Sequence, residues 1–224
     1  MTTTELIRQS DEHEFPAPAT GTPRIFLLSP ARAGGERARL LLNERAGFDL
    51  AVRLRREGAP LGELFAFMSG LYFRGKVAYS KAFAAPPPGL PGAFVIAAGF
   101  GLVPPETVIS IDQLQQMASV PVDASDPRFR EPLERDCRTL AELAGPECRF
   151  VLLGSVASLK YLDPLSGVFA DRLEFPSDFV GRGDMSRGGL MLRCARERVE
   201  LSYAPLGAAT QHGPRPPKLP RLRV

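Results

Sequence analysis

Apolar residues gather in three short runs, and each run ends in small or hydroxyl-bearing residues. The runs are 25–28 before Ser29, 94–98 before Gly99, and 150–153 before Gly154 and Ser155. Short apolar runs without polar alternation are typical of strands that are buried on both faces of a parallel sheet. In an open α/β sheet, ligands bind where the carboxyl ends of such strands meet. The pattern therefore predicts three central parallel strands and a binding site at their shared carboxyl edge.

Apolar positions at helical spacing predict helices between these strands. The expected helices begin near Glu36, cover two segments of 60–83 with a bend in a region interrupted by Gly70 and Gly75, follow Ser110 and Asp112 as a short capped helix, and run from Asp126 to just before Gly145. Residues 48–55 fit either a strand or a short helix. A helix between the second and third strands makes a βαβ unit, for which a right-handed crossover is expected. The sequence thus predicts a single α/β domain over residues 24–205, with a mostly parallel central sheet flanked by helices.

The last part of this domain is predicted to contain a helix over 159–169, an edge strand over 172–175 and a closing hairpin from 190–194 and 199–203. Between them, residues 179–190 contain four glycines together with Arg182, Asp184, Ser186 and Arg187. Glycine loses much conformational entropy when it is ordered, so an ordered glycine-rich loop usually serves a geometric purpose. We expect residues 181–189 to be a loop that folds against the carboxyl edge and presents Arg182 or Arg187 to an anion. The alternative is a self-contained loop in which Asp184 pairs with one arginine and Ser186 caps a turn.

The two ends of the chain differ in composition from the domain. Residues 1–23 are polar and contain several prolines, which predicts a flexible leader. Residues 206–224 form a proline-rich basic tail. Its four cations, Arg215, Lys218, Arg221 and Arg223, exceed the net charge of +3 of the whole chain, so the remainder is slightly acidic. The tail is expected either to contact polyanions or to remain solvated.

Composition excludes several functional classes. The hydrophobic fraction of 44% and the charged fraction of 24% are ordinary for a globular protein. No stretch approaches the roughly 18 consecutive apolar residues of a membrane span, and the start lacks a signal-peptide pattern, so we expect a cytoplasmic protein that does not bind membranes.

Cysteine and histidine usage argues against metal sites and disulfides. Cys137, Cys148 and Cys194 are odd in number and lack a CxxC pair, while His13 and His212 lie in the predicted terminal segments. A zinc site, a disulfide framework and a Ser-His-Asp triad are therefore not expected. The loop after the first strand matches neither the GxGxxG nor the Walker pattern, so no cofactor is predicted.

Two nearby segments resemble a known family. Residues 69–79, SGLYFRGKVAY, and 97–106, AAGFGLVPPE, are similar to uncharacterised bacterial α/β domains and to the uracil-DNA-glycosylase-like domain attached to archaeosine synthase and related tRNA-guanine transglycosylases. The resemblance covers 69–106 and extends to the remainder only in topology. It implies a uracil-DNA-glycosylase-like fold with a nucleobase or nucleic-acid connection. The chain departs from that pattern because residues 29–32 lack a water-activating aspartate and no histidine loop stands near the end.

The candidate site combines anion ligands with carboxylates. Arginine binds phosphate in a bidentate manner, and backbone amides in glycine-rich loops make anion-binding nests. The candidate ligand-binding residues are Ser29, Arg32, Gly99, Gly101, Gly154, Ser155, Arg182 and Arg187. Cleavage of an N-glycosidic bond needs a carboxylate that activates water or stabilises an oxocarbenium-like state, and the candidates are Glu106, Asp163 and Asp184. Candidate nucleic-acid contacts are Arg74, Lys76, Arg215 and Lys218.

Three functions are compatible with this pattern, and in the third of them the glycine-rich loop binds a free nucleotide as a regulatory ligand. The first is a nucleic-acid- or nucleotide-associated domain with an anion-binding edge, acting on the N-glycosidic bond of a nucleobase if it is an enzyme. The alternative is a non-catalytic domain that docks onto a protein partner through the glycine-rich loop and the basic tail. The mixture of aromatic residues and cations at 72–79 is open to two interpretations as well, an amphipathic helix with solvated cations or a surface that stacks bases and contacts phosphates.

Overall fold

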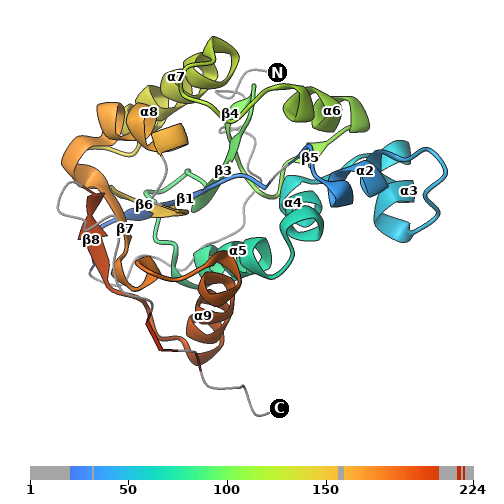
Figure 1. The fold of residues 1–224 in the computed structure, drawn as a ribbon. Coiled ribbons are helices and arrows are strands. Elements are labelled where there is room, and N and C mark those ends of the chain that lie inside the picture. The colour runs from blue at the N-terminus through green and yellow to red at the C-terminus, as the bar shows by residue number, and fades with distance from the viewer. Residues whose placement is uncertain (1–20, 32, 156–158, 207–215, 218, 220–224) are drawn as a thin grey trace.

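A computed structural model of the chain describes residues 21–31, 33–155, 159–206, 216, 217 and 219, and these form a single α/β domain (Figure 1). Most of the predicted leader and tail lies outside the described residues, as do the candidate site residues Arg32, Arg215 and Lys218. Six strands form the central sheet, with the strand order β4-β3-β1-β6-β7-β8. Their bounds are β1 Arg24–Leu28, β3 Ala93–Ala97, β4 Gly101–Val103, β6 Arg149–Leu153, β7 Leu173–Pro176 and β8 Tyr203–Pro205.

The three predicted central strands are parallel neighbours. β1 pairs with β3 on one side and with β6 on the other, and β6 continues the parallel order to β7. β4 and β8 are antiparallel to β3 and β7 and close the two ends of the sheet. The prediction of a buried, mostly parallel sheet is therefore confirmed. The predicted edge strand, β7, is an interior strand, because β8 pairs along its outer side.

Helices cover both faces of the sheet. Their bounds are α2 Glu36–Leu42, α3 Asp49–Arg56, α4 Leu61–Ser69, α5 Leu71–Phe83, α6 Ile111–Ser119, α7 Pro127–Leu143, α8 Leu159–Phe169 and α9 Asp184–Glu197, with short 3-10 turns η1 Ala170–Arg172 and η2 Ser177–Phe179. A two-stranded ladder of β2 Ala59–Pro60 and β5 Val108–Ile109 lies beside α3 and α4. The ambiguous segment 48–55 is the helix α3.

Alternate residues of the central strands supply two separate cores. Phe26 and Leu28 of β1 pack in the core beneath α2 to α5 and α9, whereas Ile25 and Leu27 pack in the core beneath α7 and α8. Figure 1 shows α5 and α9 on one face of the sheet and α7 and α8 on the other. Because both faces are covered, β3 is apolar throughout and β1 and β6 are apolar after their first residue, and this explains the unbroken runs in the sequence.

The apolar run after residue 93 makes a hairpin rather than one strand and a ligand loop. The chain reverses at Gly99 and Gly101, whose φ angles are +77° and +80°, and returns as the antiparallel β4. Glycine is favoured at both positions because side chains strain that region of backbone space. The residues after β4 therefore return to the amino end of the sheet, away from the carboxyl edge.

The predicted glycine-rich loop is mostly a helix. α9 begins at Asp184 and continues to Glu197, so the expected hairpin at 190–203 is wrong and only 203–205 forms a strand. Its glycines serve helix packing. A Cβ atom on Gly75 of α5 would lie 2.7 Å from the carbonyl oxygen of Gly188, and one on Gly188 would lie 2.8 Å from Leu71 O and Tyr72 Cα. The backbones of α5 and α9 are in direct contact, which brings residues of both helices to the carboxyl edge.

Candidate functional site

The centre of the candidate site is a contact between α5 and the end of β1. Lys76 Nζ donates hydrogen bonds to Ser29 Oγ at 2.7 Å and to Ser29 O at 2.9 Å. Lys76 is 1% exposed and Ser29 is 5% exposed. A fully buried lysine is uncommon and costly, since its charge must be compensated inside the protein.

Aromatic rings surround the Lys76 amine. Its Nζ lies 4.0 Å from the centroid of the Tyr72 ring and 5.4 Å from that of Phe73, so cation–π attraction offsets part of the cost of burial. The Tyr72 hydroxyl is itself buried, and it has no hydrogen-bond partner of normal geometry among the described residues. A buried polar group in that state is a point where a ligand can complete a hydrogen bond.

The end of β6 contributes the other wall. Tyr161 of α8 donates a hydrogen bond from its hydroxyl to Ser155 O at 2.9 Å, and the same hydroxyl accepts one from Ser155 N at 3.1 Å. Its side chain also interacts with the Ser29 hydroxyl. A Cβ atom on Gly154 would lie 3.1 Å from both Ser29 Oγ and Tyr161 Oη, so glycine there lets these two hydroxyls approach each other.

The first turn of α9 brings two charged groups to the same edge. Arg187 is buried, donates from Nε to Phe179 O at 3.2 Å, and pairs with Asp184 at 3.5 Å. The Asp184 side chain is 68% exposed. Both groups act electrostatically on Tyr72, Lys76 and Tyr161. We call Ser29, Tyr72, Lys76, Tyr161, Asp184 and Arg187 the edge cluster.

Burial dominates the titration of the edge cluster. It lowers the pKa of Lys76 to about 7, with Arg187 adding to the lowering and Asp184 opposing it. Burial raises the pKa of Tyr72 and of Tyr161, and in both cases Arg187 opposes the rise. Near neutral pH the tyrosines are therefore protonated donors, while the charged and neutral forms of the Lys76 amine are both populated.

Two predicted carboxylates lie away from this cluster. Glu106 follows β4 and pairs with Lys81 at 3.5 Å on an exposed surface, because the antiparallel β4 returns the chain to the opposite end of the sheet. Asp163 is exposed on α8 and pairs with Arg130 of α7 at 3.0 Å. Of the three candidate catalytic carboxylates, only Asp184 belongs to the edge cluster.

The predicted ligand-binding residues divide in a similar way. Ser29, Gly154, Ser155 and Arg187 come together at the carboxyl edge. Gly99 lies at the end of β3, but a Cβ there would be 3.2 Å from Val120, and one on Gly101 would be 2.0 Å from Asp136. These two glycines fit the packing of the hairpin against its neighbours rather than the approach of a ligand.

Arg74 and Lys76 do not share a surface. Arg74 is exposed, whereas Lys76 points into the domain. The prediction of Lys76 as a surface phosphate contact is therefore wrong, because a residue two positions along a helix faces another side. The alternative interpretation, a solvated cation, is also wrong for Lys76.

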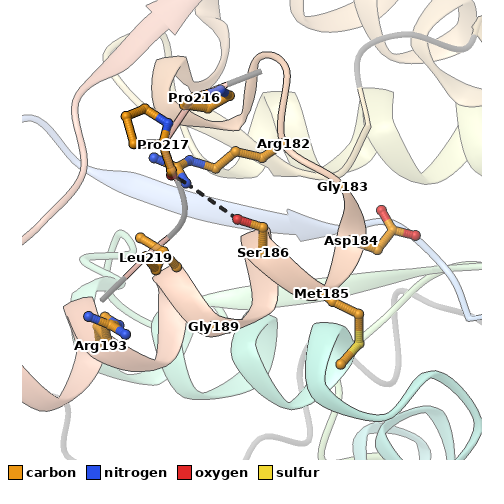
Figure 2. A pocket seen from close by; sticks show the side chains of 10 residues that line it. All are labelled: Arg182, Gly183, Asp184, Met185, Ser186, Gly189, Arg193, Pro216, Pro217 and Leu219. Atoms are coloured by element: carbon orange, nitrogen blue, oxygen red, sulfur yellow. Dashed lines mark hydrogen bonds between the residues drawn. The ribbon is translucent and has the colours of Figure 1, made fainter. Parts of the chain in front are cut away.

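Arg182 lies in a pocket on the outer face of α9 (Figure 2). The pocket has a volume of about 580 Å³ and is bounded on one side by Pro216, Pro217 and Leu219. Arg182 donates to Asp178 O, to Ser186 Oγ at 3.3 Å and to Pro217 O at 3.4 Å, so its guanidinium holds the C-terminal residues against α9. Figure 2 places Asp184 at the start of the helix, apart from this contact.

Sequence reasoning missed Tyr72, Tyr161 and the role of Lys76. A signal was available, because Tyr72, Lys76 and Tyr79 recur at spacings of four and three and so place the lysine on the apolar face of its helix. A lysine at a core position needs a partner, and that partner is Ser29.

The described residues hold no group of three or more His, Cys, Asp or Glu side chains suited to a metal ion. Among the helices of the described part, none is long and apolar enough to cross a membrane.

No protein-family model, curated protein or solved structure matches this chain. The similarity of residues 69–106 to uracil-DNA-glycosylase-like domains thus stays a prediction. The function has to be argued from the edge cluster.

Proposed function

We propose that this chain binds a nucleotide or a nucleic-acid strand through a phosphate group at the carboxyl edge of the sheet. The observation that carries the proposal is a buried guanidinium whose counter-charge is largely solvated. Arg187 is 8% exposed, whereas its ion-pair partner Asp184 lies 3.5 Å away with a side chain that is 68% exposed. Buried cations are normally compensated by anions, so the cluster favours an anionic ligand.

The polar groups of the edge suit such a ligand. Arg187 offers guanidinium donors beside the Tyr72 hydroxyl, with which it interacts, and Ser29 and Ser155 lie at the adjoining strand ends. Charge-assisted hydrogen bonds from arginine to phosphate are stronger than neutral ones. If the ligand is also cleaved at an N-glycosidic bond, Asp184 is the carboxylate at hand to stabilise a cationic sugar.

Binding is tested by calorimetric titration of the full chain with nucleoside monophosphates, single-stranded DNA and RNA. Replacing Arg187 by glutamine is expected to weaken binding by about 10-fold or more, since a charge-assisted hydrogen bond contributes about 1.5–3 kcal/mol. Arg130→Gln is the matched control. It removes a guanidinium from the α7 surface on the other face of the sheet and should leave the affinity unchanged.

Titration with nucleoside monophosphates, DNA and RNA shows whether the bound phosphate belongs to a free nucleotide or to a nucleic-acid strand. Binding of a nucleic acid, but not of nucleotides, is expected to weaken steeply with added salt as counterions are released. The proposal is wrong if no phosphate ligand binds at low salt, or if Arg187→Gln and Arg130→Gln weaken binding equally.

A further inference from the structure

The contact between Ser29 and Lys76 has the geometry of a nucleophile and its base. The 2.7 Å separation of Ser29 Oγ and Lys76 Nζ lies within the hydrogen-bond reach that proton transfer requires. Ser29 follows the last residue of β1, and its N–H donates to Leu153 O of β6, so the sheet fixes its backbone. The side chain therefore stands on a rigid element at the edge where ligands bind in α/β sheets.

The surroundings of Lys76 match those of a neutral amine. A neutral amine has two N–H donors and one lone pair. Ser29 O accepts one donor at 2.9 Å, and the face of the Tyr72 ring lies 4.0 Å away in position for the second. In this neutral form the hydrogen bond between the two side chains is reversed, and the lone pair of Lys76 Nζ accepts the proton of the Ser29 hydroxyl.

The charged and titratable groups that face Lys76 come from three helices. Burial and the proximity of Arg187 both disfavour the ammonium form, whereas the exposed Asp184 and the face of the Tyr72 ring favour it. Tyr161 faces the Ser29 hydroxyl from α8. No salt bridge to Lys76 is formed within the described residues, so the amine is not held in its charged form by a direct ion pair.

We infer that Ser29 is a nucleophile, that Lys76 is its general base, and that the pair transfers the acyl group of a carboxylic ester. Lysine serves as the base for serine in known Ser-Lys hydrolases. This activity goes beyond the proposed binding of phosphate and does not depend on it.

The reaction has two steps. Lys76 Nζ takes the proton of Ser29 as Oγ bonds to the ester carbonyl carbon, and the carbonyl electron pair moves to its oxygen. The Tyr72 hydroxyl is a donor available to that oxyanion. When the intermediate collapses, the C–O bond to the leaving alcohol breaks and Lys76 returns the proton to it. Water then attacks the acyl-Ser29 ester with Lys76 again as base, which releases the carboxylic acid and restores the hydroxyl.

The test is covalent labelling of the full chain with a fluorophosphonate, followed by mass spectrometry of its peptides. Ser29 Oγ displaces fluoride from phosphorus, and Lys76 accepts the proton. We expect one label, on Ser29, with a rate that rises with pH through about 7 as Lys76 becomes neutral. Ser29→Ala should abolish the label. Lys76→Arg, which cannot act as a base at this pH, should slow it by about 100-fold or more.

Two variants of the same helix are matched controls. Ser80→Ala removes a buried hydroxyl that donates to Val77 O, and Lys81→Arg changes an exposed lysine that pairs with Glu106. Both should be labelled at the wild-type rate. Urea denaturation of every variant establishes that it is folded.

The variant Ser29→Cys tests separately whether a reagent reaches position 29 and whether the Ser29 hydroxyl is activated. Iodoacetamide should alkylate Cys at position 29 ahead of the buried thiols of Cys137, Cys148 and Cys194. If the Ser29→Cys variant is not alkylated there, reagents do not reach the position. If it is alkylated but Ser29 of the wild type is not labelled by the fluorophosphonate, the hydroxyl is accessible but not activated. Either result overturns the inference, as does a Lys76→Arg variant that labels at the wild-type rate. Phosphate binding is measured separately, so it stands or fails independently.

Discussion

Gly188→Ala is expected to destabilise the protein by about 1–3 kcal/mol, although the same change in most helices is stabilising. The added Cβ would lie 2.8 Å from Leu71 O and from Tyr72 Cα. Both are backbone atoms, so no side-chain rotation can relieve the contact, and α5 and α9 have to separate. Their separation loosens the packing of Tyr72 and of Met191, which belong to the core on that face.

Gly167→Ala provides the control for this effect. Gly167 lies inside α8, and a Cβ there meets no described heavy atom within 4 Å. That variant should be more stable than the wild type by up to about 1 kcal/mol, because alanine has the higher helix propensity. Urea unfolding of both variants measures the difference. A stabilised Gly188→Ala would mean that the two helix backbones are not in contact.

The second large effect concerns the dependence of stability on pH. Lys76→Met is expected to unfold at a higher urea concentration than the wild type at pH 6, by about 1–3 kcal/mol in free energy. The variant loses two hydrogen bonds to Ser29 but no longer buries a charge, and apolar replacement of buried charged groups is often stabilising.

The sign of the pH dependence follows from the lowered pKa of Lys76. Below pH 7 the amine is protonated in both the folded and the unfolded state, so the folded state carries the full cost of the buried charge. Between about 7 and the ordinary value of 10.5, the folded state releases a proton that the unfolded state retains. Wild-type stability should therefore rise with pH in this window, by up to about 1.4 kcal/mol per pH unit.

Unfolding free energies measured from pH 6 to pH 8.5 test this expectation. The advantage of Lys76→Met over the wild type should shrink as the pH rises. Lys81→Met, which removes an exposed lysine on the same helix, should keep a constant difference from the wild type. Comparing variants cancels the contribution of other titrating groups, such as the three thiols. Parallel curves for the wild type and Lys76→Met would contradict a lowered pKa at this position.

The parts of the fold that local pattern determines could be predicted from the sequence. β1, β6 and the long helix α7 each have a clear apolar pattern and clear boundaries, and the helix expected after Ser110 is present with Ser110 as its N-cap. The direction of β4 could not be predicted, because the apolar run continues through the turn at Gly99. The helix α9 could not be predicted either, because its glycine-rich sequence is typical of a loop. Its glycines are explained only when the helix that packs against them is known. Gly188 is explained by α5, which lies more than a hundred residues earlier in the chain.

The sequence predicted which strand ends meet at the carboxyl edge, but not which helix side chains join them in the candidate site. Ser29, Gly154 and Ser155 followed from strand ends, which the sequence marks directly. Lys76 and Tyr161 reach the same edge from helices, and their arrival depends on how α5 and α8 pack on the sheet. A composition rule that assigns lysine to the surface fails here because the amine is held by a backbone carbonyl, a hydroxyl and a ring.

The two edge strands of the sheet, β4 and β8, affect whether two copies of the protein can pair through their strands. A free strand edge can recruit a strand from another molecule and seed aggregates. At one end, the outward N–H of Leu102 in β4 is already taken by the buried carboxylate of Asp136 at 3.0 Å. At the other end, β8 is three residues long and finishes at Pro205, which has no N–H to offer. Among the described residues, the two edge strands thus present little free backbone to a second chain, and at β4 a carboxylate occupies the position that a recruited strand would need.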